Sequence, residues 1–355
     1  MKHRSRNQRG GASIEFTELE AGDYTVEAEA WDSDNDELIA SGSKDIKVEA
    51  DKTTECSFSL IISNCFVAKD GSIVIDKTKL EKTALTTVID NATTITGSGS
   101  EGVFVDGRTV TLSPYSIGKY EVTQELFESV MGENPSNFTD SPADGETQKL
   151  RPVEKIRWYH AIVFCNKLSA LVGLDKCYTI TSGGTLVDTD SLNLSAINSA
   201  YSGWVVSCDL SKNGYRLPTA AEWEFAARGG DQNADDWNYT YAGSNDDLDS
   251  VAWYEDNSED ITHEVGLKTA NRLGLYDMSG NCWEFCWDIT FNGPSSETVT
   301  DPMGESGHSY RYRPSGSYSD DADHAKVIQI NYDSGTYPYS NNGFRLARSG
   351  FPRAN

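Results

Sequence analysis

Apolar and polar residues alternate with period two along the first part of the chain, between Ile14 and Ile62. The alternation is regular in the segment YTVEAEAWD, which begins at Tyr24. This pattern is typical of strands that bury one face. A polar turn at Asp32–Glu37 separates the segment from three further expected strands, at Leu38–Ser41, Asp45–Val48 and Cys56–Ile61.

Helical spacing of apolar residues appears later in the chain. Thr123 is a predicted N-cap for a helix that Gly132 ends, and a second helix is expected at about Trp158–Val172. A third helix is indicated by Thr219 and Glu222, which have the spacing of a capping box. The chain therefore combines a β-rich part with a mixed α+β part.

These patterns and the length of 355 residues suit two domains. We expect an unstructured or vector-derived segment at 1–13 and a small immunoglobulin-like β-sandwich at 14–63. A linker would follow at 64–97, and a larger α+β domain at 98–352.

Charge and cysteine content exclude several functions. The net charge of −25 would repel phosphate backbones, so we expect no nucleic-acid partner. No apolar run is long enough to cross a membrane, and the start lacks the apolar core of a signal peptide. The seven cysteines form neither a CxxC motif nor a zinc-type Cys/His spacing.

The stretch from Tyr310 to Asn342 has an unusual composition. It holds Tyr310, Tyr312, Tyr318, Tyr332, Tyr337 and Tyr339 among Ser, Asp and Asn, with no Glu, Cys or Trp. Tyrosine offers a large contact area with few torsions, and the short polar residues offer adaptable hydrogen bonds, as in antibody paratopes. The alternative is an irregular tyrosine-rich edge of a sheet with polar turns.

Several longer motifs resemble those of one enzyme family. They include GYRLPTAAEWEFAARGG at 214–230, THEVGLKTANRLGLYDMSGNCWEFCWD at 262–288 and the closing NNGFRLA. In this order they closely resemble the formylglycine-generating, sulfatase-modifying family across about residues 98–349. The resemblance implies an α+β domain with a C-type-lectin-like fold.

The resemblance does not extend to the residues that carry the family's chemistry. In those enzymes a cysteine pair stands two and seven residues after the aromatic residue of a GSY or GSW motif. Here the motif ends at Tyr318, and the two positions hold Asp320 and Ala325. Copper binding and thiol oxidation need a thiolate, so we expect a protein that is not an enzyme.

The C-terminus is also similar to the variable region of bacterial proteins that are diversified by retroelements. In those genes adenine-directed mutation fills the variable sites with Asn, Ser, Tyr, Asp and His, ahead of a GFRLAR-like anchor. This resemblance implies a cell-surface ligand-binding lipoprotein, expected to be a monomer, with a variable region at about 310–345. An oxidase of the sulfatase-modifying type and a glycan-binding lectin are the alternatives, and the ligand is an unknown protein or glycan.

The expected ligand-binding residues are called the predicted patch below. They are Tyr318, Ser319, Asp320, Asp321, Asp323, His324, Gln329, Ile330, Asn331, Tyr332, Asp333, Ser334, Tyr337, Tyr339, Ser340 and Asn341.

We expect no cofactor, with a structural calcium ion as a side hypothesis. The family resemblance would place this ion at the segment DMSGNCWE, with ligands from Asp277, Gly280, Cys282 and Glu284. Oxygen ligands suit a hard cation. In the equal alternative, Asp277 and Glu284 cap a turn and bond backbone amides.

Overall fold

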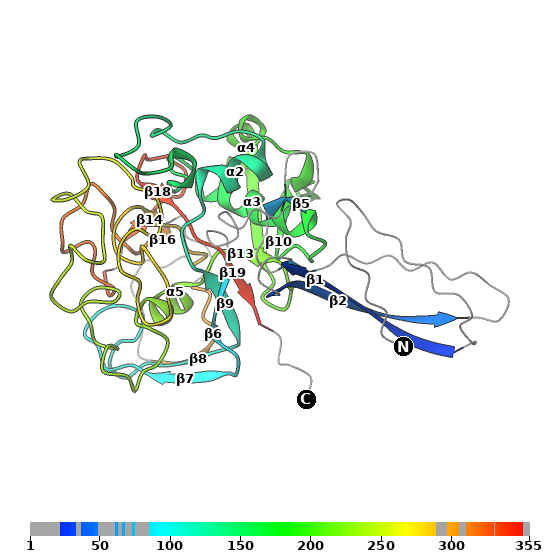
Figure 1. The fold of residues 1–355 in the computed structure, drawn as a ribbon, viewed down its shortest axis with the longest axis horizontal. Helices are drawn as coiled ribbons and strands as arrows, with labels where there is room; N and C mark the ends of the chain where they lie inside the picture. Colours follow the sequence, from blue (N-terminus) through cyan, green and yellow to red (C-terminus); the bar gives the residue numbers. More distant parts are fainter. Residues whose placement is uncertain are drawn as a thin grey trace. The chain divides into compact units, whose positions relative to one another are not determined.

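The computed structural model describes residues 22–32, 37–48, 61–62, 66–67, 73–74, 85–288, 297–304, 310–329 and 331–350, with side chains from residue 85 onward. The chain forms two compact units, residues 1–62 and 63–355 (Figure 1).

The first unit contains one antiparallel sheet in its described residues. Its strands are β1 (Gly22–Asp32), β2 (Glu37–Val48) and β3 (Ile61–Ile62), in the order β1-β2-β3. The two strands expected at 38–41 and 45–48 are one continuous strand, because residues 41–44 also pair with β1. Residues 42–44, which separate the two expected strands, therefore lie within the sheet. Most of the turn at Asp32–Glu37 lies outside the described residues.

The sheet of the second unit begins earlier than the sequence indicated. Strand β6 (Leu85–Ile89) pairs with β9 (Tyr115–Gly118), and β7 (Thr93–Thr96) pairs with β8 (Thr109–Leu112). Both β6 and β7 fall within the expected linker at 64–97. Both strands are short and contain several threonines, and pairing with strands further along the chain makes them part of a sheet.

The remaining elements of this unit are as follows: β4 (Phe66–Val67), β5 (Ile73–Val74), α2 (Gln124–Met131), η1 (Gln148–Leu150), α3 (Trp158–Leu171), β10 (Tyr178–Ser182), β11 (Thr185–Leu186), η2 (Thr189–Ser191), α4 (Leu194–Ala200), η3 (Tyr201–Gly203), β12 (Trp204–Cys208), β13 (Tyr215–Arg216), α5 (Ala220–Ala227), β14 (Trp283–Glu284), β15 (Thr298–Thr300), β16 (Arg311–Tyr312), β17 (Tyr332–Asp333), β18 (Asn342–Gly343) and β19 (Ala347–Ser349).

The larger sheets have the orders β13-β19-β9-β6, β15-β8-β7 and β11-β10-β12. The pair β14-β18 is parallel, and the pair β16-β17 is antiparallel. In Figure 1, α2, α3 and α4 lie together, and α5 contacts β8. Strand β16 lies near the start of the tyrosine-rich segment and β18 at its end, and strand β19 then returns the chain to the central sheet.

The three predicted helix starts are confirmed, and the two predicted stops agree with the structure to within one residue. The side chain of Thr123 accepts a hydrogen bond from the N–H of Leu126, and Gly132 ends α2 with a φ of 82°. Such a left-handed residue favours glycine. Helix α3 begins at Trp158 and ends one residue before the expected Val172. The capping box of Thr219 with Glu222 is present at the start of α5.

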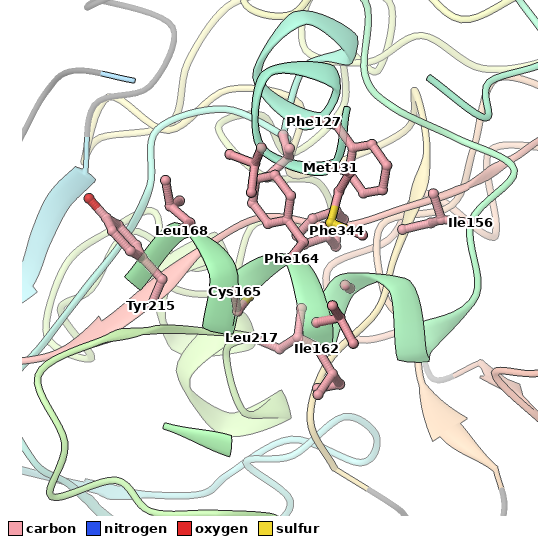
Figure 2. Packing of buried hydrophobic residues seen from close by; sticks show 14 of the residues in the cluster. Phe127, Met131, Ile156, Ile162, Phe164, Cys165, Leu168, Tyr215, Leu217 and Phe344 are labelled. Carbon is pink, nitrogen blue, oxygen red and sulfur yellow. The ribbon is translucent and has the colours of Figure 1, made fainter. Parts of the chain in front are cut away.

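Aromatic packing joins α2 and α3 to the C-terminal part of the chain (Figure 2). The rings of Phe127 and Phe164 stack with centroids 5.3 Å apart, and Phe344 lies edge-on to both. Cys165 is fully buried beside them, as predicted. Phe344 follows β18 directly, so this core holds the end of the tyrosine-rich segment.

Trp223 and Trp283 are the anchors that we expect to determine stability. Each is at most 1% exposed. Replacing either with Ala leaves a large cavity and should lower the free energy of unfolding by about 3–5 kcal/mol. Tyr337 is 63% exposed, so Tyr337→Ala should cost less than about 0.5 kcal/mol. Urea denaturation of the three variants measures this difference, and equal losses would show that the tyrosine belongs to the core.

Candidate functional site

The tyrosine-rich segment is tied to the scaffold along its length. The N–H groups of Trp158 and Lys155 donate to the carbonyls of Gly335 (3.0 Å) and Tyr339 (3.1 Å). The N–H of Trp283 donates to the carbonyl of Asn341 at 2.8 Å. The loop after β17 is therefore held by the start of α3 and by β14.

The segment Lys326–Ile330 would be a strand if its side chains alternated between two faces. Residues 321–329 instead form turns, with the N–H of Gln329 donating to the carbonyl of Lys326. Ala325 and Val327 are each 1% exposed, so burial alternates as it would in a strand. The alternation here comes from turns packed on the core. Ile330 lies outside the described residues.

The predicted patch contains five exposed positions. Tyr337 and Tyr339 are 63% and 49% exposed, and their ring centroids lie 6.0 Å apart. Ser319, Asp321 and Asp323 are also exposed. The half-buried members are Asp320, His324, Gln329, Asn331, Tyr332, Ser334, Ser340 and Asn341. The tyrosine pair thus offers the largest free apolar surface of the patch.

Two predicted contact residues lie below the surface. Tyr318 is 6% exposed, packs edge-on against Phe138 with centroids 5.2 Å apart, and its hydroxyl lies 3.2 Å from that of Ser340. Asp333 is 7% exposed and accepts a hydrogen bond from the N–H of Gly335 at 2.7 Å. Both side chains support the backbone of the patch and are not part of its exposed surface. Composition cannot separate such supporting residues from exposed residues of the same type.

Arg313 is a site residue that the sequence analysis missed. Its N–H donates to the carbonyl of Asn331 at 2.9 Å, and its guanidinium donates to the side-chain oxygen of Asn342 at 2.5 Å. It therefore holds both ends of the loop 331–342. The sequence feature that could have indicated this role is that Arg313 is one of few cationic residues in a tyrosine-rich stretch.

The surroundings of Arg313 place several patch residues near one another. Burial lowers the pKa of Arg313, and the nearby Asp333, Asp320 and Tyr339 oppose that shift. The guanidinium also lies over the ring of Trp283, 5.1 Å from its centroid. Direct contacts join the two stretches: the amide of Asn341 donates to the hydroxyl of Ser317 at 3.3 Å, and the hydroxyls of Tyr318 and Ser340 lie 3.2 Å apart.

The exposed acidic residues of the patch have local partners. Asp321 lies 2.7 Å from the imidazole of His324, and Asp323 lies 2.7 Å from the ammonium of Lys326. Pairs exposed to water contribute little to stability. They instead give this edge of the patch a mixed charge.

The residues proposed for calcium do not fit the ion in this arrangement. Both carboxylate oxygens of Glu284 accept hydrogen bonds from Arg345, and one also accepts from the indole of Trp223. Asp277 accepts from the N–H of Gly266, and the carbonyl of Gly280 accepts from Ser315. Within the described residues, no three His, Cys, Asp or Glu side chains are grouped as metal ligands. We therefore derive no role for calcium.

The cysteines in the described ranges are poor nucleophiles. Cys282 and Cys286 are fully buried free thiols, and burial raises the pKa of both well above the ordinary value. A thiol held in its neutral form neither attacks a substrate nor binds a metal.

A buried carboxyl group supports the patch from behind. Glu154 is 0% exposed, and one of its oxygens accepts the N–H groups of Asn137 and Phe138 at 2.6 and 2.8 Å. Burial raises the pKa of Glu154 to about 7, and the two N–H donors oppose the shift. Because Phe138 packs on Tyr318, this carboxyl group fixes the loop beneath the patch.

The raised pKa of Glu154 makes stability depend on pH. Below the ordinary pKa of 4.5 the carboxyl is protonated in both states. As the pH rises toward 7 the unfolded chain loses the proton first, so the free energy of unfolding falls. Glu154→Gln cannot ionise, so its unfolding free energy should not fall in this way. We expect the difference in unfolding free energy, variant minus parent, to be about 2–3 kcal/mol larger at pH 8 than at pH 4.

Urea denaturation across this pH range tests the expectation. Burial also raises the pKa of Asp288 to about 7. Ionisation of Asp288 therefore also lowers the unfolding free energy as the pH rises, independently of Glu154. A constant difference between Glu154→Gln and the parent from pH 4 to pH 8 would contradict the assignment.

None of the helices within the described residues has the length and apolar character needed to cross a membrane.

Comparisons with known proteins agree with this geometry. A solved structure called Treponema denticola variable protein 1 is similar, with 41% sequence identity and a TM-score of 0.69, covering 75% of this chain and 94% of that one. A protein of Paenibacillus barcinonensis described as chaperone protein LppX is 41% identical over 223 residues, 57% of this chain and 73% of the relative.

A formylglycine-generating enzyme of Thermomonospora curvata is 33% identical over 132 residues, 34% of this chain and 41% of that enzyme. Residues 73–350 match the family described as sulfatase-modifying factor enzyme 1-like domain. With its mixed helices and sheets, the second unit has the C-type-lectin-like fold of these proteins. The chain belongs to the sulfatase-modifying factor enzyme 1-like family.

Proposed function

We propose that this chain is a ligand-binding protein without enzymatic activity, displayed on a bacterial cell surface, whose predicted patch is diversified by a retroelement. The observation that carries the proposal is the exposed pair Tyr337 and Tyr339 on a loop fixed at both ends. Exposed aromatic side chains on a fixed backbone lose little entropy on binding.

The similarity to a variable protein supports this proposal, since it extends over nearly that whole chain. The Paenibacillus relative is named a chaperone and not an enzyme, which also supports the proposal. The family's chemistry requires a cysteine pair. At the two positions that the resemblance implies for it, this chain has Asp320 and Ala325. The remaining described thiols are buried or half-buried.

Diversification has a genetic signature. Sequencing this gene from many cells of one culture lineage should reveal substitutions concentrated in the codons of residues 318–341, with an unmutated near-copy of that segment beside a reverse transcriptase gene. Substitutions spread evenly along the gene would argue against it. Antibody labelling of intact cells tests the surface display.

Binding through the patch is tested with a glycan array and an array of purified proteins. The double variant Tyr337→Ala/Tyr339→Ala should lose at least about 90% of any signal, because aromatic residues at interface centres commonly carry 2 kcal/mol or more. Tyr239→Ala is the matched control, since Tyr239 is 36% exposed and lies outside the patch. Signals that survive in the double variant would place the binding surface elsewhere. The array that responds separates a protein ligand from a glycan.

Absence of catalysis is tested directly. Incubated with cysteine-containing sulfatase-type peptides, with and without added copper, the purified chain should produce no formylglycine by mass spectrometry. The buried thiols and the residues at 320 and 325 provide no thiolate to start the reaction. Turnover above that of a heat-denatured sample would restore the oxidase alternative.

A further inference from the structure

A linked group of aromatic side chains lies at the start of α3, outside the predicted patch. The ring centroids of Trp158 and Trp287 are 5.4 Å apart. The ring of Tyr159 lies 5.2 Å from that of Trp158 and 4.9 Å from that of Tyr201. Trp158 is fully buried, whereas Tyr159, Tyr201 and Trp287 are half-buried and so keep part of their surface in contact with solvent.

The guanidinium of Arg311 is stacked on this group. Its central carbon lies 3.6 Å from the centroid of the Trp158 ring and 5.6 Å from that of Trp287. Its Nη1 donates to the carbonyl of Trp287 at 3.1 Å, whereas Nε and Nη2 have no partner within the described residues. Stacking on an aromatic face orients the plane of a guanidinium. The remaining N–H groups of Arg311 are therefore held in a fixed direction and are available to a ligand.

No described carboxylate forms an ion pair with Arg311, although the chain has 55 acidic and 30 basic residues. The charge of Asp288 acts on Arg311, but Asp288 is buried and accepts the N–H of Ala220 at 2.5 Å. Asp333 is the partner of Arg311 in the pair β16-β17, and its carboxylate accepts the N–H of Gly335 instead. Burial lowers the pKa of Arg311 to about 10, so the side chain stays a cation at neutral pH.

Further polar groups lie around the same rings. The guanidinium carbon of Arg157 is 5.5 Å from the centroid of the Tyr201 ring, and its Nε is buried without an acceptor among the described residues. Burial raises the pKa of Tyr159 and the charge of Arg311 opposes this shift, so the Tyr159 hydroxyl lies close to that guanidinium. The hydroxyls of Tyr159 and Tyr201 form no hydrogen bond with any described residue. Two cations and two hydroxyl groups are thus left for an external partner.

We propose that these side chains form a second binding site, the aromatic–arginine cluster, and that its ligand is an acidic sugar, a pyranose with one carboxylate. The cluster consists of Arg157, Trp158, Tyr159, Tyr201, Trp287 and Arg311. A carboxylate accepts two parallel hydrogen bonds from a guanidinium. Phenolic hydroxyls both donate to and accept from sugar hydroxyls, and the half-buried rings offer apolar surface to the face of the pyranose. The net charge of −25 repels polyanions, so a ligand with a single charge fits best.

The cluster adjoins the predicted patch but shares no residue with it. The N–H of Trp158 donates to the carbonyl of Gly335, which links the start of α3 to the loop 331–342. Because the argument uses none of the patch side chains, it does not rest on the proposed function. Binding at one site can fail while binding at the other is retained.

NMR titration of the full chain with methyl β-D-glucuronide tests the proposal. Methyl β-D-glucoside is the matched probe, since it has the same ring with a hydroxymethyl group in place of the carboxylate. We expect the glucuronide to cause saturable shifts of the Trp287 indole N–H and the Arg311 Nε–H. The glucoside should bind about tenfold more weakly or worse, because charge-assisted hydrogen bonds are lost. Acetate binding as tightly as the glucuronide would show a simple anion site and overturn the assignment of a sugar.

Variants locate the site. Arg311→Met keeps an apolar side chain on Trp158 but removes the charge, and it should weaken glucuronide binding about tenfold or more. Arg272→Met is the matched control, because Arg272 is 41% exposed and already paired with Asp231 and Asp236. That variant should bind as the parent does.

If Arg311→Met fails to fold, Tyr201→Phe takes its place. That variant removes one hydroxyl that has no partner within the described residues, so it should fold and bind about two- to tenfold more weakly. The proposal is wrong if the glucuronide does not saturate the parent chain, or if the folded cluster variant binds it as tightly as Arg272→Met does.

Discussion

A buried ion pair between Glu284 and Arg345 joins the main parts of the second unit. Both side chains are 0% exposed, and the guanidinium contacts the carboxylate through Nε and Nη2 at 2.6 and 2.5 Å. Its remaining donors bond the carbonyls of Gly118, Tyr276 and Asp277. Removing one partner of such a pair leaves an uncompensated buried charge, which costs about 3–5 kcal/mol. The pair therefore links β9, β14 and the residues between β18 and β19.

The tyrosine-rich segment depends on this link for its position. Strands β14 and β18 run parallel, with Trp283 opposite Asn342 and Glu284 opposite Gly343. The register places the end of the segment beside the core aromatic residues, and Arg313 then connects Asn342 to the start of the loop at Asn331. A long irregular loop can keep one conformation when its ends are fixed by regular structure and its carbonyls by buried donors. The exposed side chains on its outer surface are not needed to hold this conformation.

Binding and catalysis would place different demands on this scaffold. A thiol enzyme needs an accessible thiolate, and burial keeps the fully buried thiols here in their neutral form. A binding surface needs exposed groups on a backbone that does not move. The exposed pair Tyr337 and Tyr339, on the anchored loop 331–342, matches this requirement. Glu154, which is buried, holds the backbone at Asn137 and Phe138, and Phe138 packs on Tyr318.

The sequence by itself determined the family resemblance, the helix limits at Thr123, Gly132 and Thr219, and the tyrosine-rich composition, because caps, glycine conformations and motifs act over a few residues. Only the tertiary structure decided which residues of that composition are exposed. Tyr318 is buried against Phe138, which is distant in the sequence. Asp333 is buried within a turn, where it accepts the N–H of Gly335. The expected strand at 326–330 is a series of turns, since packing on a core can produce the same alternation as a sheet. Whether Glu284 met a metal ion or Arg345 depended on a contact across 61 residues, and a local pattern carries no information about such a contact.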